Sequence, residues 1–497
     1  MKKGICVFLA FLMIFSLFGC ASEEPEIIEN EAVFGEISSE SSSFEEEYSE
    51  TEKAESENSS SSGSSEVSSE PESSSSSSSE KPEESSSSSS SSSENEPSSE
   101  SSSASSESSS SEESSESSSS GQEEPIQNTY VPSGETRAVW ISYLEYQSVL
   151  QGKSEKQFRN NIKAMFKNLA SDGFNTVFVH VRSHSDAMYE SDIFPWSVYC
   201  TGTEGNNPGF DPLEIMVSEA HSAGLKIEAW INPYRVKGNS NTDKIAKSSP
   251  AYKWVGTGKV IVLDNGIFYN PADKEVVELI VSGVEEIVRN YDVDGIHFDD
   301  YFYPTTAESF DKTYYNAYKA GGGKLSLAEW RRQNVNILIK NVYSAIKAID
   351  SSCRFGISPG GNTDRNYNSL YCDVYTWVTS KGYVDYICPQ LYYGFNNRDC
   401  PYLDVLSEFN DIITRSEIEL IIGLAAYKAG AEDTYAGENG KKEWINNNDI
   451  LARQIIAARN ESRYSGFAMY RYDSLYNPAS GVKKAVAAEI ENLFDIL

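Results

Sequence analysis

Two adjacent carboxylates, Asp299 and Asp300, stand at the end of a short, largely apolar segment, 295–298, and three aromatic residues, 301–303, follow them. Paired carboxyl groups suit the cleavage of a glycosidic bond, because one can protonate the leaving oxygen while another group stabilises the sugar cation. The aromatic rings offer flat apolar faces on which sugar rings can lie. A carboxylate at a strand end can also cap the next turn, so the pair alone leaves a structural role open.

The elements that would position this pair form a regular alternation. Eight apolar segments are predicted as strands: Arg137–Ser142, Asn175–Val181, Lys226–Asn232, Asp294–Asp299, Arg354–Ser358, Asp385–Leu391, Glu419–Ala425 and Gly466–Arg471. Stretches with apolar residues three and four apart are predicted as helices: Glu155–Ala170, Pro212–Ala223, Lys274–Asn290, Leu327–Ile349, Asp373–Ser380, Asp449–Arg459 and Val482–Leu493. Residues 235–265 and 301–325 are predicted as long loops. This α/β alternation predicts a single (β/α)8 TIM barrel over residues 130–497.

In such a barrel the site lies at the C-terminal ends of the strands. Polar and aromatic residues near these ends are therefore the candidates for substrate binding: Arg182, Asp186, Asn232, Tyr234, Arg235, Tyr301, Tyr303, Gln390, Tyr392 and Arg471. Three of the tyrosines, at positions 301, 303 and 392, are expected to stack on sugar rings. His297 lies on the same face of its strand as Asp299. It either serves that site, orienting the carboxylate, or fills the barrel core.

The first residues of the chain, 1–19, have the pattern of a secretory signal peptide, with Lys2 and Lys3 before a nearly unbroken apolar run. The sequence Leu17-Phe18-Gly19-Cys20 resembles the bacterial lipoprotein box, which implies cleavage before Cys20 and a lipid on its sulfur. An ordinary signal peptide with a chance cysteine is the alternative. Several acyl chains give the stable anchoring that one chain cannot. The predicted location is extracytoplasmic, lipid-anchored to the bacterial cell membrane.

Residues 20–129 are predicted as a disordered linker, because they are mostly Ser and Glu and offer no periodic apolar residues to bury. Between Ala21 and Glu124, 29 Glu and 2 Lys carry −27 of the chain's net charge of −34. The acidity therefore belongs to the linker and says little about a substrate. The mildly acidic remainder argues against nucleic-acid binding.

The predicted barrel offers no pattern for a metal, a cofactor or a disulfide framework. It contains five cysteines without regular spacing: Cys200, Cys353, Cys372, Cys388 and Cys400. No Cys-x-x-Cys or paired-His pattern is present, and the whole chain has only four His. We therefore predict chemistry by side chains alone.

Several motifs resemble the bacterial glycosyl-hydrolase-like family 10, and they occur in the right order over nearly all of residues 135–475. They are Arg137-Ala-Val-Trp-Ile, Phe174-Asn-Thr-Val-Phe-Val-His-Val-Arg182, Asp186-Ala-Met-Tyr-Glu-Ser191, Phe194-Pro-Trp-Ser197, Ala229-Trp-Ile-Asn-Pro-Tyr-Arg-Val236, Asp294-Gly-Ile-His-Phe-Asp-Asp-Tyr-Phe-Tyr-Pro304, Phe355-Gly-Ile-Ser-Pro359 and Pro389-Gln-Leu-Tyr392. The resemblance implies a (β/α)8 barrel and a secreted or lipid-anchored hydrolase. It also implies a polysaccharide substrate, since members of known activity cut peptidoglycan glycan strands that have lost their stem peptides. This chain departs from the family pattern at Ser183, at Gly360-Gly361-Asn362-Thr363 and at Tyr393, positions that could line the sugar cleft.

Two mechanisms fit these residues. By analogy with hexosaminidases that use the substrate's own acetamide, Asp299 would polarise the acetamide and Asp300, with a raised pKa, would be the general acid. Alternatively, Asp299 is a nucleophile with a carboxyl partner from another strand, such as Asp186 or Asp473. Two other functions stay open: a lipoprotein that binds glycan without cutting it, and a glycosidase for dietary or host polysaccharide.

The lipoprotein box gives a direct prediction. The mature protein should partition with membranes, and Cys20→Ala should release it or leave the precursor uncleaved, because the thiol that carries the lipid is gone. Membrane and soluble fractions of producing cells, compared by immunoblot, measure this. A wild-type protein found wholly in the soluble extracellular fraction would contradict the lipid anchor.

Overall fold

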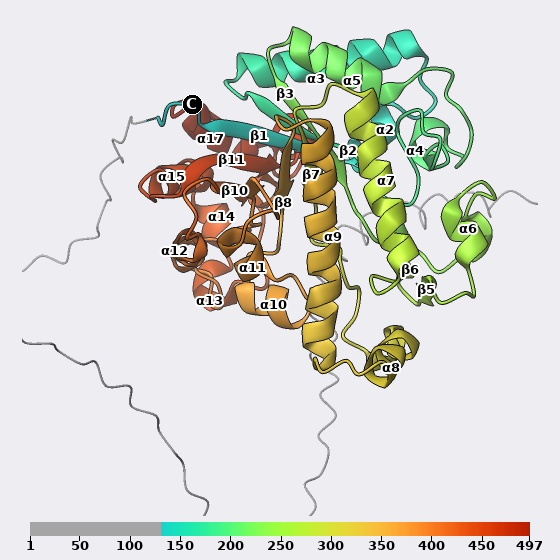
Figure 1. The fold of residues 1–497 in the computed structure, drawn as a ribbon. Coiled ribbons are helices and arrows are strands. Elements are labelled where there is room, and N and C mark those ends of the chain that lie inside the picture. Colours follow the sequence, from blue (N-terminus) through green and yellow to red (C-terminus); the bar gives the residue numbers. More distant parts are fainter. Residues whose placement is uncertain (1–130) are drawn as a thin grey trace, which may run out of the picture. The chain divides into compact units, whose positions relative to one another are not determined.

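The computed structural model describes residues 131–497, and the predicted signal peptide and linker lie outside them. Eight parallel strands close into a barrel in the order β1-β11-β10-β9-β8-β7-β3-β2 (Figure 1). Their bounds are β1 Thr136–Ile141, β2 Thr176–Arg182, β3 Lys226–Ile231, β7 Gly295–Phe298, β8 Arg354–Ile357, β9 Tyr386–Ile387, β10 Glu419–Ala425 and β11 Tyr464–Tyr470. The (β/α)8 barrel predicted from the alternation is confirmed, and each predicted strand overlaps an observed one.

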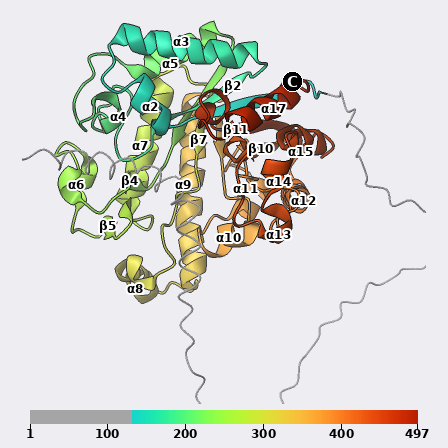
Figure 2. The same cartoon turned by 180° about the vertical axis from the view of Figure 1, so that it is seen from behind.

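Helices surround the barrel (Figures 1 and 2). One long or medium helix follows each strand: α3 Glu155–Ser171, α5 Pro212–Ser222, α7 Lys274–Asn290, α9 Leu327–Ile349, α11 Val374–Thr379, α12 Tyr402–Ile412, α15 Ile450–Ala458 and α17 Lys483–Phe494. Shorter helices decorate the loops: α2 Tyr143–Val149, α4 Val198–Thr201, α6 Pro250–Trp254, α8 Lys312–Ala320, α10 Thr363–Asn368, α13 Gly437–Gly440, α14 Glu443–Asn446 and α16 Tyr472–Tyr476. Three 3-10 turns, Thr242–Lys244, Glu308–Phe310 and Ala426–Lys428, complete the set.

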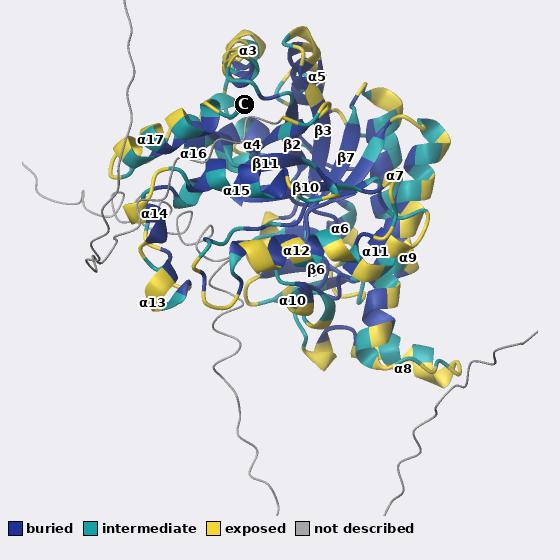
Figure 3. Cartoon of the chain, turned by 90° about the vertical axis from the view of Figure 1, so that its left-hand side faces the viewer, coloured by how far each residue is buried: buried dark blue, intermediate teal, exposed yellow. Residues whose placement is uncertain are grey.

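The helix α7 illustrates why these segments fold as they do. Its N-cap, Asp273, accepts hydrogen bonds from the backbone N–H groups of Glu275 (2.8 Å) and Val276 (3.3 Å), which have no partner within the helix. Val276, Ile280 and Val284 recur every four residues and are fully buried. The helix therefore turns one apolar stripe to the barrel. Figure 3 shows the same division, with buried strands inside and exposed residues on the outer sides of the helices.

Two segments predicted as loops carry regular structure, which corrects the sequence interpretation. Residues 235–265 contain α6 and two strands, β4 Arg235–Lys237 and β5 Val260–Leu263, which form an antiparallel sheet with β6 Gly266–Tyr269. Strands of three or four residues are too short for an alternating pattern to be recognised. Residues 301–325 contain α8, and α12, which follows the sixth strand, had no predicted counterpart.

The inside of the barrel is filled by large side chains, and small residues make room for them. Trp140, Phe178, Trp230 and Tyr386 belong to one buried cluster. A Cβ added at Gly356 would lie 2.0 Å from the ring carbon Cζ of Tyr386, so only glycine permits this ring to cross the interior. The packed interior gives the catalytic end a solid floor.

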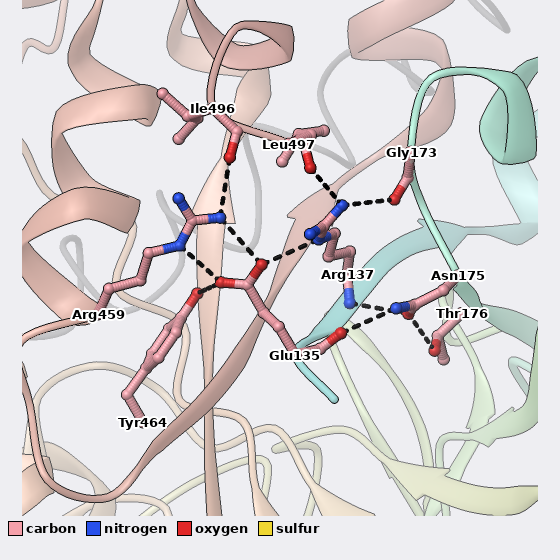
Figure 4. A network of polar contacts seen from close by, with 9 residues as sticks. All are labelled: Glu135, Arg137, Gly173, Asn175, Thr176, Arg459, Tyr464, Ile496 and Leu497. Atoms are coloured by element: carbon pink, nitrogen blue, oxygen red, sulfur yellow. Dashed lines mark hydrogen bonds and ion pairs between the residues drawn. The ribbon is translucent and has the colours of Figure 1, made fainter. Parts of the chain in front are cut away.

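At the opposite end of the barrel, a buried ion-pair network joins the first and last parts of the fold (Figure 4). Glu135, just before β1, accepts hydrogen bonds from Arg459 (2.8 and 2.9 Å), Tyr464 (2.8 Å) and Arg137 (2.9 Å). Arg459 also donates to the carbonyl of Ile496 (3.0 Å). Burial alone would raise the pKa of Glu135, but the hydrogen bonds from Arg459 and Tyr464 and the charge of Arg459 outweigh it, so this pKa lies below its usual value.

Within residues 131–497, no helix is both long enough and apolar enough to cross a bilayer. The five cysteines of this region are all free and buried. Burial raises the pKa of the Cys353 thiol to about 12, which disfavours the reactive thiolate there.

The network gives a prediction about stability. Glu135→Gln should lower the free energy of unfolding at neutral pH by about 3–5 kcal/mol, because Arg459 would be left buried without its counter-charge. The contribution of an acid with a lowered pKa is complete above its ordinary value, 4.5, and is lost as the pH falls through the folded value. The wild-type advantage should therefore shrink on acidification. Urea unfolding at several pH values measures it.

The matched control is Glu155→Gln, because Glu155 forms an exposed pair with Arg159 at 3.4 Å. That variant should change stability by no more than about 0.5 kcal/mol. Equal effects of the two substitutions would contradict the role given to the buried network.

Candidate active site

The catalytic end of the barrel brings Asp299, Ser358 and Gln390 together from three neighbouring strand ends. Asp299 Oδ1 accepts a hydrogen bond from Gln390 Nε2 (3.1 Å) and another from the backbone N–H of Asp300 (2.9 Å). Gln390 Nε2 also donates to the carbonyl of Ser358 (3.1 Å). The Asp299 carboxylate is therefore held at one oxygen.

The two carboxyl groups of the pair differ in burial. Asp299 is 7% exposed, whereas Asp300 is half-buried. Burial, the charge of Asp300 and a side-chain hydrogen bond with it raise the pKa of Asp299 well above its usual value, and the positive charge of Arg235 opposes this only in part. The sequence argument placed the raised pKa on Asp300. The structure places it on Asp299, because this residue lies deeper and the two groups share a proton.

Aromatic side chains form a wall beside the pair, with Tyr470 at its centre. The ring centroid of Tyr470 lies 5.8 Å from that of Tyr392, 6.2 Å from Tyr427, 6.0 Å from Trp140 and 6.5 Å from Trp230. Burial raises the pKa of Tyr470 well above its usual value, and the charge of Asp299 adds to this. The wall and the carboxylate therefore belong to one site.

The other side of the pair carries Tyr301 and Arg235. Tyr301 is 36% exposed, and the guanidinium of Arg235 lies 5.2 Å from the centre of its ring. Burial raises the pKa of Tyr301, and the charges of Asp299 and Asp300 act in the same direction while Arg235 opposes them. Of the predicted substrate-binding residues, Arg235, Tyr301, Gln390 and Tyr392 thus surround the carboxyl pair.

Arg182 lies outside this group, because its strand is irregular. The pairing between β2 and β3 shifts by one residue between His180 and Arg182, and a one-residue shift moves a side chain to the other face of a sheet. The Arg182 guanidinium lies over the ring of Phe194, 3.8 Å from its centre. It also occupies the space beside Gly283 of α7, where an added Cβ would lie 2.3 Å from Nη1. This arrangement suits the interface between barrel and helix.

Tyr303 is buried under α9, in contrast to Tyr301. It is 2% exposed and accepts a hydrogen bond from Asn334 Nδ2 (3.2 Å). Its ring packs edge-on against Tyr371, at a centroid distance of 5.1 Å, and lies 5.2 Å from the Arg331 guanidinium. A stacking role for Tyr303 in sugar binding therefore does not fit its position.

His297 occupies the barrel core below the carboxyl pair. Its Nε2 accepts a hydrogen bond from Trp140 Nε1 (3.2 Å), which places the ring proton on Nδ1, 2.7 Å from the Tyr386 hydroxyl. Tyr386 donates in turn to Glu228 (2.6 Å). Burial lowers the pKa of His297 to about 3. The core alternative left open by the sequence is the one that this geometry favours.

The remaining candidates are engaged in local contacts at the rim. Asp186 is buried, and burial raises its pKa to about 6, with Lys237 opposing. Arg471 donates to Glu145 (2.6 Å) and contacts Asp473 at 3.5 Å. Neither of the carboxylates considered as a second partner, Asp186 or Asp473, has Asp299 among these contacts.

Asn232 and Tyr234 follow β3 and are both buried. Asn232 Nδ2 donates to the carbonyl of Ser183 (3.2 Å), which leaves its side-chain oxygen without a hydrogen-bond partner among the described residues. The Tyr234 ring lies edge-on to Phe302, 6.4 Å between centroids. Asn232 can still accept a hydrogen bond, whereas Tyr234 serves mainly as packing.

With this geometry in place, comparison with known proteins is decisive. Residues 135–440 match the family described as Glycosyl hydrolase-like 10. The chain belongs to this family. It is 33% identical over 383 residues to the glycosyl hydrolase YngK of Bacillus subtilis (strain 168), an alignment that covers 72% of each chain. It is 35% identical over 339 residues to the glycosyl hydrolase DigH of Escherichia coli (strain K12), covering 62% of this chain and 74% of that one.

A solved structure, the PgaB (BpsB) glycoside hydrolase domain from Bordetella bronchiseptica, aligns over 73% of this chain and 98% of its own, with a TM-score of 0.49 and 14% identity. Family membership makes this protein a glycoside hydrolase, and a polysaccharide is its implied substrate. Within residues 131–497, no group of three or more His, Cys, Asp or Glu side chains is arranged to hold a metal ion.

In this glycosyl hydrolase, sequence reasoning noted Tyr470 and Tyr427 only as strand ends and did not assign them to the site. The position of Tyr470 after an alternating strand was a usable signal, because β11 turns alternate residues inward. Gly361 was read as a departure from the family pattern. A Cβ there would lie 2.4 Å from the Gln390 carbonyl oxygen, so glycine allows the fifth strand end to approach the residue that holds Asp299.

The raised pKa of Asp299 gives a stability prediction of the opposite sign to that of Glu135. Below the ordinary Asp value of 3.8 both folded and unfolded protein are protonated at this group. As the pH rises past it, the unfolded chain gains by ionising and the wild type loses stability. Asp299→Asn, which cannot ionise, should therefore be more stable than wild type at pH 7, and the difference should shrink toward pH 4. Urea unfolding measures both.

Asp292→Asn is the control, since the Asp292 side chain is 96% exposed and should show no such pH-dependent gain. A wild type as stable as Asp299→Asn at pH 7 would show that burial of this carboxyl carries no cost.

Proposed function

We propose that this glycoside hydrolase cuts peptidoglycan glycan strands that lack stem peptides. The observation that carries the proposal is the buried, proton-sharing Asp299–Asp300 pair beside an aromatic wall at the C-terminal end of the barrel. Wall sugars carry 2-acetamido groups, which offer an internal nucleophile, a donor N–H and an apolar methyl. The family resemblance in the motifs supports the same substrate.

Acetamide assistance suits the way Asp299 is held. Its Oδ1 accepts hydrogen bonds from Gln390 and the Asp300 backbone, which leaves Oδ2 to accept the N–H of a bound acetamide. That N–H stabilises the Asp299 carboxylate, so the shared proton settles on Asp300, the more exposed carboxyl. Asp300 is then the general acid.

The reaction balances in two steps. The acetamide oxygen attacks C1, the C1–O bond breaks, and the Asp300 proton passes to the leaving oxygen, which gives an oxazolinium ion and a shortened glycan. Water then attacks C1 and gives its proton to Asp300, and the ring opens to restore the acetamide. A two-carboxylate route through Asp186 or Asp473 is less favoured, because each of these is committed to rim contacts.

The location proposed for this activity follows from the N-terminal pattern. A lipid on Cys20 would hold the protein at the outer surface of the cell membrane. The Ser- and Glu-rich residues 20–129 would then act as a spacer, whose charge repulsion extends it. Such a spacer would let the barrel reach glycan in the surrounding wall.

The test is turnover by Asp299→Asn and Asp300→Asn, each of which should lower the rate of glycan cleavage on the order of 10²-fold or more. On a substrate with a good leaving group, which needs no proton, Asp300→Asn should recover activity and Asp299→Asn should not. Reducing-end release from peptide-free peptidoglycan strands, other polysaccharides and chromogenic glycosides measures these effects.

A double variant that is folded and still cleaves at the wild-type rate would remove the pair from the mechanism. Turnover of other polysaccharides but not of peptide-free peptidoglycan strands would contradict the proposed substrate. Glycan binding by the wild type without turnover on any glycan would point to a binding protein.

A further inference from the structure

A groove of about 460 Å³ lies on the outer wall of the barrel, away from the catalytic pair. It runs along α9 and is bounded on the other side by residues near α10 and α11, which lie beside α9 in Figure 1. The side chains that give it its chemistry are Arg332, Gln333, Asn336, Lys340, Tyr367 and Tyr383. None of them belongs to the site described above.

The groove is elongated and begins at the catalytic end. Its residues on α9 extend from Glu329 to Lys340, which spans about 16 Å along the helix axis. The first turns of α9 follow the loop after β7, so they lie toward the catalytic end, whereas Tyr383 precedes β9 and lies toward the opposite end. A groove of this length and direction fits a linear chain better than a compact ligand.

The exposed groups in the groove match the chemistry of a sugar chain. Tyr367 and Tyr383 are half-buried rings whose hydroxyls have no hydrogen-bond partner among residues 131–497. The exposed side chains of Gln333 and Lys340 add hydrogen-bonding groups, and the side chain of Ile337 is 46% exposed between them. Rings with polar groups at their edges are the combination that binds both faces and hydroxyls of a sugar.

The walls of the groove are fixed by internal contacts, so they are formed before any ligand binds. Arg332 lies over the Tyr367 ring at 3.8 Å and donates to the Tyr367 carbonyl (2.9 Å). Asn336 donates to Asp373 (2.9 Å) and accepts from Trp377 Nε1 (2.6 Å). Preformed walls lower the entropy cost of binding.

A single residue separates the groove from the catalytic pair along the chain. Asn366, next to Tyr367, donates to the carbonyl of Gly360 (2.6 Å). A Cβ at Gly360 would lie 3.7 Å from Asp300 Oδ2. The short helix α10 therefore touches the catalytic site on one side and lines the groove on the other.

We propose that this groove is a second glycan-binding site, which holds a further stretch of the polymer whose bond is cut in the barrel. The proposal rests on the function proposed above, because a polymeric glycan substrate supplies a linear chain long enough to occupy both sites. The groove then increases affinity for long strands by making the second contact intramolecular, and it leaves the chemistry at Asp299 and Asp300 unchanged.

The experiment compares long and short substrates in the full-length protein. Two variants are made, Gln333→Ala with Lys340→Ala, which removes only exposed groups, and Tyr383→Ala, which removes a ring. Each should raise the half-saturating concentration of peptide-free glycan strands about five-fold. Each should leave kcat and KM for a short chromogenic glycoside at wild-type values. Leu403→Ala is the control, because Leu403 is 51% exposed on α12 and lies outside the groove.

The same substitutions in an Asp300→Asn background are tested for binding to insoluble glycan by sedimentation, which needs no turnover. Weaker binding by both groove variants supports the groove even if the proposed cleavage of peptidoglycan fails. Polymer binding and kinetics equal to those of Leu403→Ala would overturn the groove and leave the proposed function standing. An equal loss on the short substrate would also overturn it, since the groove would then act through the catalytic site.

Discussion

Closure of the barrel is the constraint on which the site depends, because strand ends from across the chain meet only if β1 and β11 pair in the correct register. Thr136 pairs with Gly466 and Val139 with Met469. A slip of one residue would turn Trp140 and Tyr470 outward and dismantle the aromatic wall. The Glu135–Arg459 pair at the far end of these strands fixes the two ends of the fold to each other, so a structural ion pair indirectly sets the geometry of the site.

The two buried acids show how one fold uses the same chemistry in opposite ways. Glu135 is buried among donors, and their hydrogen bonds outweigh desolvation. Asp299 is buried beside another carboxyl, so desolvation and repulsion act together and Arg235 compensates only partly. The first arrangement stabilises the folded state at neutral pH and the second destabilises it. Storing an unfavourable charge is useful only where substrate binding relieves it, which is consistent with Asp299 lying at the catalytic end.

Much of this arrangement could be predicted from the sequence, because it follows from local periodicity. The eight strands, the barrel and the convergence of Asp299, Gln390 and Tyr392 all come from alternation and strand-end position. What failed depends on contacts that no periodicity encodes. A shift in strand pairing turned Arg182 away from the site, and the burial of Tyr303 depends on α9, which is distant in sequence.

His297 and Asp299 show the limit of the pattern most clearly. Both point into the barrel from β7, and the sequence gives them equal access to a substrate. They differ in depth: His297 is level with Trp140 and Tyr386, which saturate both of its nitrogens, whereas Asp299 lies one layer higher, at the end of the packed core. Two residues along a strand are therefore enough to separate a core residue from a candidate catalytic one. The boundary is set by the size of the neighbours: Tyr386 fills the space over Gly356, and this closes the interior below the carboxyl pair.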